Sequence, residues 1–272
     1  MTKTIMITGS TDGIGFETAK LLARDGHTLL LHGRNAQKLE AVIKAVKAIP
    51  GAGTVKPYQA DLSNLAAVAQ MAEQVGRDYS ELDVLINNAG VFVLPNPVTK
   101  DGYDLRFIVN TIAPYVLTKC LLPLMSETSR VVNLSSAAQA PVDLEALSGN
   151  RALSDGEAYA QSKLAITMWS FELAMSLAPA GPTIIAVNPA SFLGSKMVKE
   201  AYGREGHDLS IGAEVLVRAS LSDDFASANG QYFDNDRGQF SSPHPDALSS
   251  DKNQRLVTAI EQVIAILDRS QS

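Results

Sequence analysis

Tyr159 and Lys163 stand four positions apart in the run Ala158-Tyr-Ala-Gln-Ser-Lys163. On a helix this spacing places a phenol and an ammonium on one face. A free tyrosine titrates at about pH 10, too high for a good base at neutral pH, so a neighbouring cation would help it to exchange protons. The bland alternative is a half-buried tyrosine beside a lysine whose stem packs on apolar surface, and most pairs of this spacing are of that kind.

A glycine-rich turn near the N-terminus predicts anion binding. The short apolar strand Ile5–Ile7 leads into Thr8-Gly-Ser-Thr-Asp-Gly-Ile-Gly15, and an amphipathic segment follows. Glycines allow a tight turn and a close backbone approach to a ligand, and a helix N-terminus attracts a pyrophosphate. The alternative is a plain glycine-rich connection, because such patterns give false positives. The predicted dinucleotide contacts are Gly9, Ser10, Thr11, Asp12, Gly13, Ile14 and Gly15.

The end of the second predicted strand bears on which dinucleotide binds. In a nucleotide-binding unit this strand end faces the adenosine ribose, where an acidic residue would bind the free hydroxyls. Here the first charged residue is Arg34, followed by Asn35, with Lys38 one turn further on. A guanidinium can bind a 2′-phosphate at two points. The sequence therefore favours NADP(H) over NAD(H), with a solvated arginine as the alternative.

Two further strand ends carry expected cofactor contacts. Asp61 follows the third strand, where a short polar side chain could meet the adenine ring. The alternative is an ordinary polar residue at a strand end, with no role in binding. Small residues at the fourth strand end would let the backbone lie against a flat ligand, while the asparagine amides tie neighbouring strands together. These additional predicted contacts are Asp61, Leu62, Asn87, Ala89 and Gly90.

The segments that must position these residues alternate strand and helix without a break in composition. This pattern predicts an α/β fold with a doubly wound parallel sheet of about seven strands (Rossmann fold) and helices on both faces. We expect one domain over residues 1–272, with a polar, movable substrate loop at about 191–210 and a C-terminal helix at about 252–267. The predicted strands are Ile5–Ile7, His27–Leu31, Thr54–Ala60, Leu82–Ile86, Arg130–Leu134, Pro182–Asn188 and Gln231–Phe233.

Helical spacing and end signals place the helices between these strands. Ser63 is the expected N-cap of the helix Leu65–Asp78. Pro114 is expected to bend the apolar pair of segments around it. Residues 235–247 should be irregular. The other predicted helices are Ala36–Ile49, Leu105–Ala113, Tyr115–Met125, Ala158–Leu177 and Ile211–Leu221.

Composition limits the class of protein. The chain has 272 residues, with 23 basic and 29 acidic side chains, a net charge of −6 and no basic run, which argues against nucleic acid as the main partner. We expect no membrane span, no signal peptide, no metal site and a cytoplasmic location. The single cysteine, Cys120, cannot form an internal disulfide and is expected to be a packed side chain.

Four separated elements now match one family in order. They are the Thr8–Gly15 turn, Asn87-Asn-Ala-Gly90, a serine ending the fifth strand, and Tyr159-x-x-x-Lys163. Through them the chain resembles the short-chain dehydrogenase/reductase family over nearly its whole length. The serine and tyrosine lie 23 positions apart, and this long spacer is similar to that of the retinol-dehydrogenase and protochlorophyllide-reductase-like branch.

The resemblance implies a role for each catalytic position. Tyr159 is the general acid in carbonyl reduction and the base in the reverse reaction, and Lys163 lowers its pKa and holds the nicotinamide ribose. Ser136, aligned with the family's second serine and preferred to Ser135, orients the substrate oxygen. Asn110 positions a water that links the lysine to solvent.

The same resemblance places the nicotinamide beside the sixth strand end. Pro189 and Phe192 are the implied contacts there. Ala190 stands where the family has glycine, which adds a Cβ and leaves the contacts of Phe192 and Ser195 open.

These inferences predict an NADP(H)-dependent carbonyl reductase or alcohol dehydrogenase for a small to medium hydrophobic substrate. The alternative is a catalytically silent nucleotide sensor or scaffold, since a fold alone does not establish chemistry. A protochlorophyllide-type reductase is a third reading, and it would call for a pigment-binding cysteine. A homodimer or homotetramer through the long helices Tyr115–Met125 and Tyr159–Leu177 is the family expectation.

Overall fold

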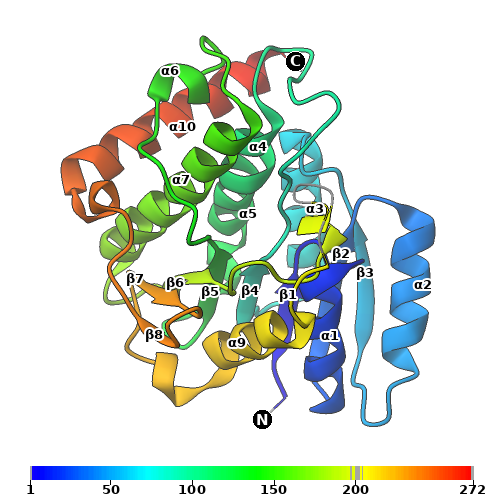
Figure 1. The fold of residues 1–272 in the computed structure, drawn as a ribbon. Helices are drawn as coiled ribbons and strands as arrows, with labels where there is room; N and C mark the ends of the chain where they lie inside the picture. Colours follow the sequence, from blue (N-terminus) through cyan, green and yellow to red (C-terminus); the bar gives the residue numbers. More distant parts are fainter. Residues whose placement is uncertain (1, 197, 200–202, 204, 271–272) are drawn as a thin grey trace.

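The computed structural model describes residues 2–196, 198–199, 203 and 205–270. Its centre is an eight-stranded sheet in the order β3-β2-β1-β4-β5-β6-β7-β8 (Figure 1). All pairs from β3 to β7 are parallel, and β8 pairs antiparallel with β7. The strands are β1 Thr4–Ile7, β2 Thr28–Gly33, β3 Val55–Gln59, β4 Val84–Asn87, β5 Arg130–Leu134, β6 Thr183–Asn188, β7 Gln231–Asp234 and β8 Gln239–Phe240. The predicted doubly wound sheet is confirmed, with one additional strand.

Helices cover both faces of the sheet because its strands are apolar on both sides. In β1, Ile5 and Ile7 join the core beneath α1, α2 and α9, while Met6 joins the core beneath α3, α5, α7 and α10. The strand order reverses between β1 and β4, and in such folds ligands bind at the carboxyl ends beside that point. The longer helices are α1 Gly13–Arg24, α2 Ala36–Lys47, α3 Leu65–Asp78, α5 Ala113–Leu121, α7 Asp155–Leu177, α9 Leu209–Leu221 and α10 Ser250–Ser270.

Several predicted boundaries are wrong. The N-cap of α3 is Asn64, whose side chain accepts from the N–H of Ala67, and not Ser63. Helix α7 begins at Asp155 instead of Ala158, because Ser154 and Glu157 form a reciprocal capping box. Part of the segment expected to be irregular forms β8.

The bend expected near Pro114 is a π-helical turn that precedes it. A short α4, Leu105–Phe107, passes into the π-turn Ile108–Ile112 and then into α5, whose first turn contains the proline. Such turns are rare and are frequent at functional sites. The further short helical turns are Leu122–Leu124, α6 Leu144–Leu147, Asp223–Phe225 and Pro245–Leu248.

The combined stretch Leu105–Leu124 bears on the expected absence of a membrane span, which stays a prediction. It has 20 residues, and its most apolar 18-residue window has a mean hydropathy of 1.5, so by length and composition alone the stretch could span a membrane. However, 61% of its most apolar window is buried inside the protein, which is typical of a core helix.

Cys120, expected to be packed, lies exposed on α5.

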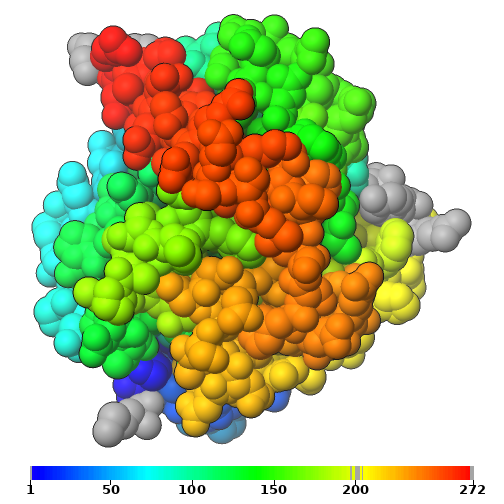
Figure 2. Space-filling view, turned by 90° about the vertical axis from the view of Figure 1, so that its left-hand side faces the viewer, coloured from blue at the N-terminus to red at the C-terminus, as the bar shows by residue number. Residues whose placement is uncertain are grey.

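Helix α10 packs on one of the two helices expected to form an oligomer surface, α7, and contacts the other, α5, through one hydrogen bond. In Figure 2 its orange and red residues run across one face of the molecule. Its apolar stripe packs on α7, and Glu261 accepts a hydrogen bond of 2.8 Å from the hydroxyl of Tyr115 on α5. The buried stripe consists of Leu256, Ile260, Val263 and Leu267. An oligomer built on these two helices would need other faces of them, and the oligomeric state stays a prediction.

Candidate active site

The glycine-rich loop between β1 and α1 packs directly on the turn after β4. Gly9 and Gly13 have φ angles of +64° and +56°, which favour glycine. A Cβ on Gly9 would lie 2.8 Å from the Cα of Ala89, and one on Gly15 would lie 2.4 Å from Nδ2 of Asn88. The loop therefore leaves no room for side chains on this side.

Thr8 and Asn88, which belong to the two sequence motifs but are not among the expected cofactor contacts, hold this contact. The Asn88 side chain donates to the carbonyl oxygens of Thr8 (2.8 Å) and Gly9 (3.0 Å). In return, Oγ1 of Thr8 accepts from the N–H groups of Asn88 (3.0 Å) and Ala89 (3.1 Å). The neighbouring Asn87 points into the core and donates to Asn133 of β5 (2.8 Å), so this amide ties two strands together.

A buried histidine fixes the start of the same loop. Nδ1 of His32 accepts from the N–H of Gly9 at 3.0 Å, and Nε2 lies 3.1 Å from the carbonyl oxygen of Ala60. These two partners require a neutral ring with its proton on Nε2. Burial lowers the pKa of His32 to about 4, so the ring stays neutral at physiological pH. Ser10 donates its hydroxyl to the His32 carbonyl (3.0 Å), so its side chain serves the loop.

The loop geometry fits a dinucleotide pyrophosphate. Helix α1 has 12 residues and begins at Gly13, so its positive end faces the turn. Asp12 caps it by accepting the Gly13 N–H at 2.8 Å and is exposed. Thr11 lies against Gly33 of β2, where a Cβ would come within 2.4 Å of the threonine methyl. Ile14 packs toward α9.

The expected adenosine contacts lie at the ends of β2 and β3. Arg34 is exposed, and Asn35 is occupied as the N-cap of α2, accepting from the N–H of Lys38 at 2.9 Å. Asp61 is exposed and accepts from the N–H (2.9 Å) and hydroxyl (2.8 Å) of Ser63. The side chain of Leu62 is in the core, so it does not face this edge.

Helix α7 carries the phenol and the ammonium together. Nζ of Lys163 lies 5.7 Å from the ring centroid of Tyr159 and donates to the carbonyl oxygen of Leu134 at 2.8 Å. Burial lowers the pKa of Lys163 to about 8. The ring of Tyr159 packs against that of Phe92, with centroids 4.4 Å apart.

The two serines after β5 have different surroundings. Ser135 is buried, and its hydroxyl contacts Thr167 Oγ1 at 2.7 Å and the Lys163 carbonyl at 3.1 Å. Ser136 is partly exposed, and its hydroxyl accepts the local N–H of Ala138 at 3.1 Å. Of the two hydroxyls, that of Ser136 is the one open to a substrate.

The backbone of Ser136 is held from β7 and from the spacer between β5 and α7. Its carbonyl oxygen accepts from the hydroxyl of Tyr232 (3.1 Å) and from Nε2 of Gln139 (2.9 Å). Burial first, and then Asp234 and Asp236, raise the pKa of Tyr232, which keeps this phenol a proton donor. Neither Tyr232 nor Gln139 was found from the sequence.

Asn110 lies in the π-turn, fully buried. Its Oδ1 accepts the N–H of Val91 at 2.8 Å, and its Nδ2 donates to the carbonyl of Val91 (2.9 Å) and to Oγ of Ser162 (3.0 Å). The side chain thus fixes the loop after β4, and its role in a water relay stays a prediction.

The turn after β6 is strained. Ala190 has φ +123° and Phe192 φ +52°, conformations that side chains other than glycine rarely adopt. The carboxylate of Asp236 holds the turn, accepting from the N–H (2.8 Å) and hydroxyl (2.6 Å) of Ser191. The Pro189 carbonyl accepts from Asn235 at 3.0 Å.

The expected substrate loop begins from this turn. Leu193 and His207 form an isolated bridge that closes the segment, and Ser195 lies beside Gly13 of the glycine-rich loop. Residues 197, 200–202 and 204 fall outside the described residues, so the expected movement of the loop stays a prediction.

The chain belongs to the short-chain dehydrogenase/reductase family: the profile described as short chain dehydrogenase matches residues 3–205. Within that family it lies in the retinol-dehydrogenase-like branch. It is 30% identical to human retinol dehydrogenase 13 over 273 residues, covering 93% of this chain and 82% of the relative. Mouse retinol dehydrogenase 12 and human retinol dehydrogenase 11 are further relatives.

Solved structures show the same fold. An uncharacterised protein from Mycobacterium paratuberculosis superposes with a TM-score of 0.79 at 28% identity, covering 96% of this chain and 92% of that one. A short chain dehydrogenase of Shigella flexneri complexed with NADP gives 0.67 at 26% identity, covering 86% and 97%. The chain is therefore an oxidoreductase of this family.

Proposed function

We propose that this enzyme transfers a hydride between NADP(H) and a carbonyl or secondary alcohol of a small to medium hydrophobic molecule. The observation that carries the proposal is the buried ammonium of Lys163, 5.7 Å from the ring of Tyr159. A cation in this position favours the phenolate over the phenol and so brings the tyrosine toward a useful pKa.

The chain's own groups handle the proton and the substrate oxygen. In carbonyl reduction the Tyr159 hydroxyl gives its proton to the substrate oxygen, and in the reverse direction the phenolate removes it. The Ser136 hydroxyl donates a hydrogen bond to the same oxygen and stabilises the charge that develops there. Lys163 holds the nicotinamide ribose and stabilises the phenolate. When bound, the cofactor supplies or accepts the hydride.

The choice of NADP(H) rests on Arg34, which is exposed at the end of β2 with no acidic residue beside it in sequence. The NADP complex of the Shigella relative supports the same choice. A hydrophobic substrate is supported by apolar side chains on the loops after β4 and β6. Val93, Val98 and Phe192 are 42%, 54% and 55% exposed.

The test compares the wild type with Tyr159→Phe on a panel of ketones, aldehydes and quinones, following NADPH oxidation. The variant should bind NADPH with unchanged affinity, measured by cofactor fluorescence, while kcat falls by about 100- to 10,000-fold. Turnover that survives in Tyr159→Phe would contradict the assignment. The cytoplasmic location and a homo-oligomeric state stay predictions, to be tested by fractionation and by solution scattering.

A further inference from the structure

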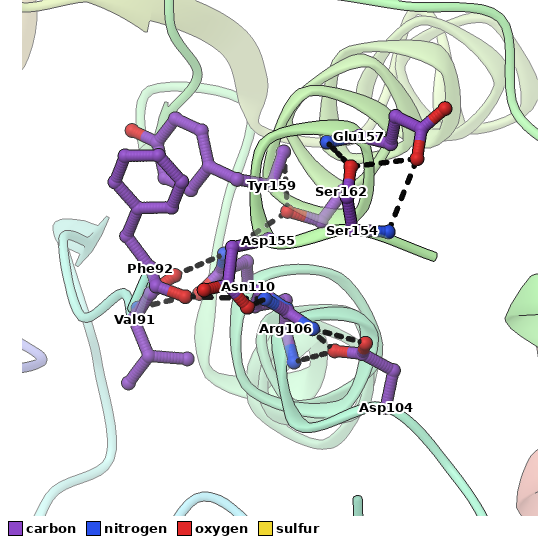
Figure 3. Close-up of polar contacts among 10 residues, drawn as sticks. All are labelled: Val91, Phe92, Asp104, Arg106, Asn110, Ser154, Asp155, Glu157, Tyr159 and Ser162. Carbon is purple, nitrogen blue, oxygen red and sulfur yellow. Dashed lines mark hydrogen bonds and ion pairs between the residues drawn. The ribbon is translucent and has the colours of Figure 1, made fainter. Parts of the chain in front are cut away.

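Arg106 and Asn110 lie four residues apart on α4 and the following π-turn, and both reach the loop after β4 (Figure 3). Asn110 binds both backbone groups of Val91. NH1 of Arg106 lies 3.5 Å from the carbonyl oxygen of Phe92, a contact longer than an ordinary hydrogen bond. The loop is thus held at two successive residues.

The same two side chains also hold α7. Asn110 donates to Ser162, whose hydroxyl donates to the carbonyl oxygen of Tyr159 at 2.7 Å. Arg106 donates through NH1 to Asp155, the first residue of α7. The short α4 segment therefore connects the loop after β4 with the first turns of the helix that carries the reactive tyrosine.

The guanidinium of Arg106 is held rigidly. It is 1% exposed, and its Nε and NH2 bind the two oxygens of Asp104 at 2.8 Å and 2.6 Å. A two-point contact of this kind fixes the plane of the guanidinium, unlike a loose surface ion pair. Asp155, by contrast, has a side chain 46% exposed.

The loop that Arg106 holds carries the ring that touches Tyr159. The rings of Phe92 and Tyr159 lie at 34° with centroids 4.4 Å apart, and Figure 3 shows Phe92 against the face of the tyrosine. Ring contacts of this kind limit how far a tyrosine side chain can rotate. The placement of Phe92 therefore bears on where the phenol hydroxyl points.

We propose that Arg106 is a positioning residue for hydride transfer. By joining the Phe92 carbonyl to Asp155, it holds the Phe92 ring against Tyr159 and sets the distance of the phenol from Lys163. This inference rests on the proposed role of Tyr159. Displacing a reacting group by about 1 Å can lower a rate about 100-fold, so the effect should appear in kcat.

Asp155→Asn tests the proposal, because it removes the charge of a half-exposed partner while keeping its shape. We expect kcat to fall about 10- to 100-fold, with NADPH affinity changed less than about twofold. The pH profile of kcat for alcohol oxidation should move to higher pH, because a tyrosine further from the ammonium titrates closer to about 10. Arg106→Lys keeps the charge but loses the two-point contact, and it should give the same changes.

Arg106→Ala is avoided, because it would leave the nearly buried Asp104 without a cation and could unfold the protein. If Arg106→Lys also fails to fold, Asp155→Asn alone decides. The matched control is Asp251→Asn, which removes an acidic residue from the first turn of α10 and should leave kcat as in the wild type.

If Asp155→Asn kept the wild-type kcat and pH profile and only its melting temperature fell, the proposal would be overturned. Arg106 would then have a structural role alone. That outcome is distinct from failure of the proposed function, in which Tyr159→Phe itself would keep its turnover. The double variant Arg106→Lys/Asp155→Asn should be no slower than Arg106→Lys alone, because both changes break one connection.

Discussion

Nζ of Lys163 lies 2.8 Å from the carbonyl oxygen of Leu134, the last residue of β5. The ammonium is therefore buried at the carboxyl edge of the sheet, next to the phenol of the same helix. Burial lowers its pKa to about 8. A cation that stabilises a phenolate is thus maintained against the preference of its surroundings, an arrangement found more often at active sites than elsewhere.

This burial predicts a pH dependence of stability. The unfolded chain keeps the proton of Lys163 up to about pH 10.5, whereas the folded chain loses it near pH 8. Between these values the unfolded state binds more protons, so the free energy of unfolding should rise with pH. The rise attributable to Lys163 should be about 3 kcal/mol from pH 8 to 10.5. Urea unfolding of the cofactor-free enzyme measures it.

Lys163→Met lacks the titrating group, so its free energy of unfolding should not show this rise. Lys44→Met, at an exposed position of α2, is the control and should follow the wild type. If the pH dependence of Lys163→Met ran parallel to that of the wild type, the lysine would not be a buried cation in solution.

The burial of His32 predicts that the free energy of unfolding falls at low pH. Its pKa is about 4 in the folded chain and 6.5 without burial, so the unfolded state binds more protons between these values. The free energy of unfolding should therefore fall as the pH drops from 6.5 to 4. The wild type should lose about 3 kcal/mol more than His32→Gln over that window. Equal losses in the two proteins would mean that His32 is protonated in the folded state.

The sheet and its order of elements can be predicted from the sequence, because short apolar runs such as Ile5–Ile7 and the turns that end them are local signals. The role of His32 cannot be predicted from the sequence, because its partners are main-chain atoms 23 and 28 positions away. Main-chain groups carry no residue-type signal. The start of α7 could have been predicted from the sequence, because Ser154-x-x-Glu157 is a capping-box pattern.

The candidate site also contains residues that can be predicted from the sequence and residues that cannot. Tyr159 and Lys163 can be predicted as a pair because residues four positions apart on one helix are neighbours in any fold. Phe92 and Arg106 become visible only when the loop after β4 meets α7. The local sign that was available is a single arginine within an apolar helical stretch, since a buried guanidinium needs a carboxylate partner.

Arg34 predicts the cofactor preference. If its guanidinium binds the 2′-phosphate, Arg34→Ala should lower kcat/KM for NADPH about 10- to 100-fold, the usual range for losing charge-assisted hydrogen bonds. The value for NADH should change less than about twofold, and Arg34→Asp should favour NADH further. Arg24→Ala, at an exposed arginine in the last turn of α1, is the control. An unchanged ratio of the two cofactors in Arg34→Asp would refute the phosphate assignment.

The strain at Ala190 predicts a stabilising substitution. At φ +123° a Cβ is unfavourable, at about 1 to 3 kcal/mol, whereas glycine adopts this conformation freely. Glycine also adds freedom to the unfolded chain, which offsets about 0.4 to 1 kcal/mol of that gain. Ala190→Gly should therefore raise the free energy of unfolding by about 1 kcal/mol in urea titrations. Ala152→Gly, at an exposed loop residue without positive φ, should lower it slightly, so the two variants should differ in sign. Destabilisation by both would mean that the turn after β6 is relaxed, and that Asp236 holds it without opposing strain.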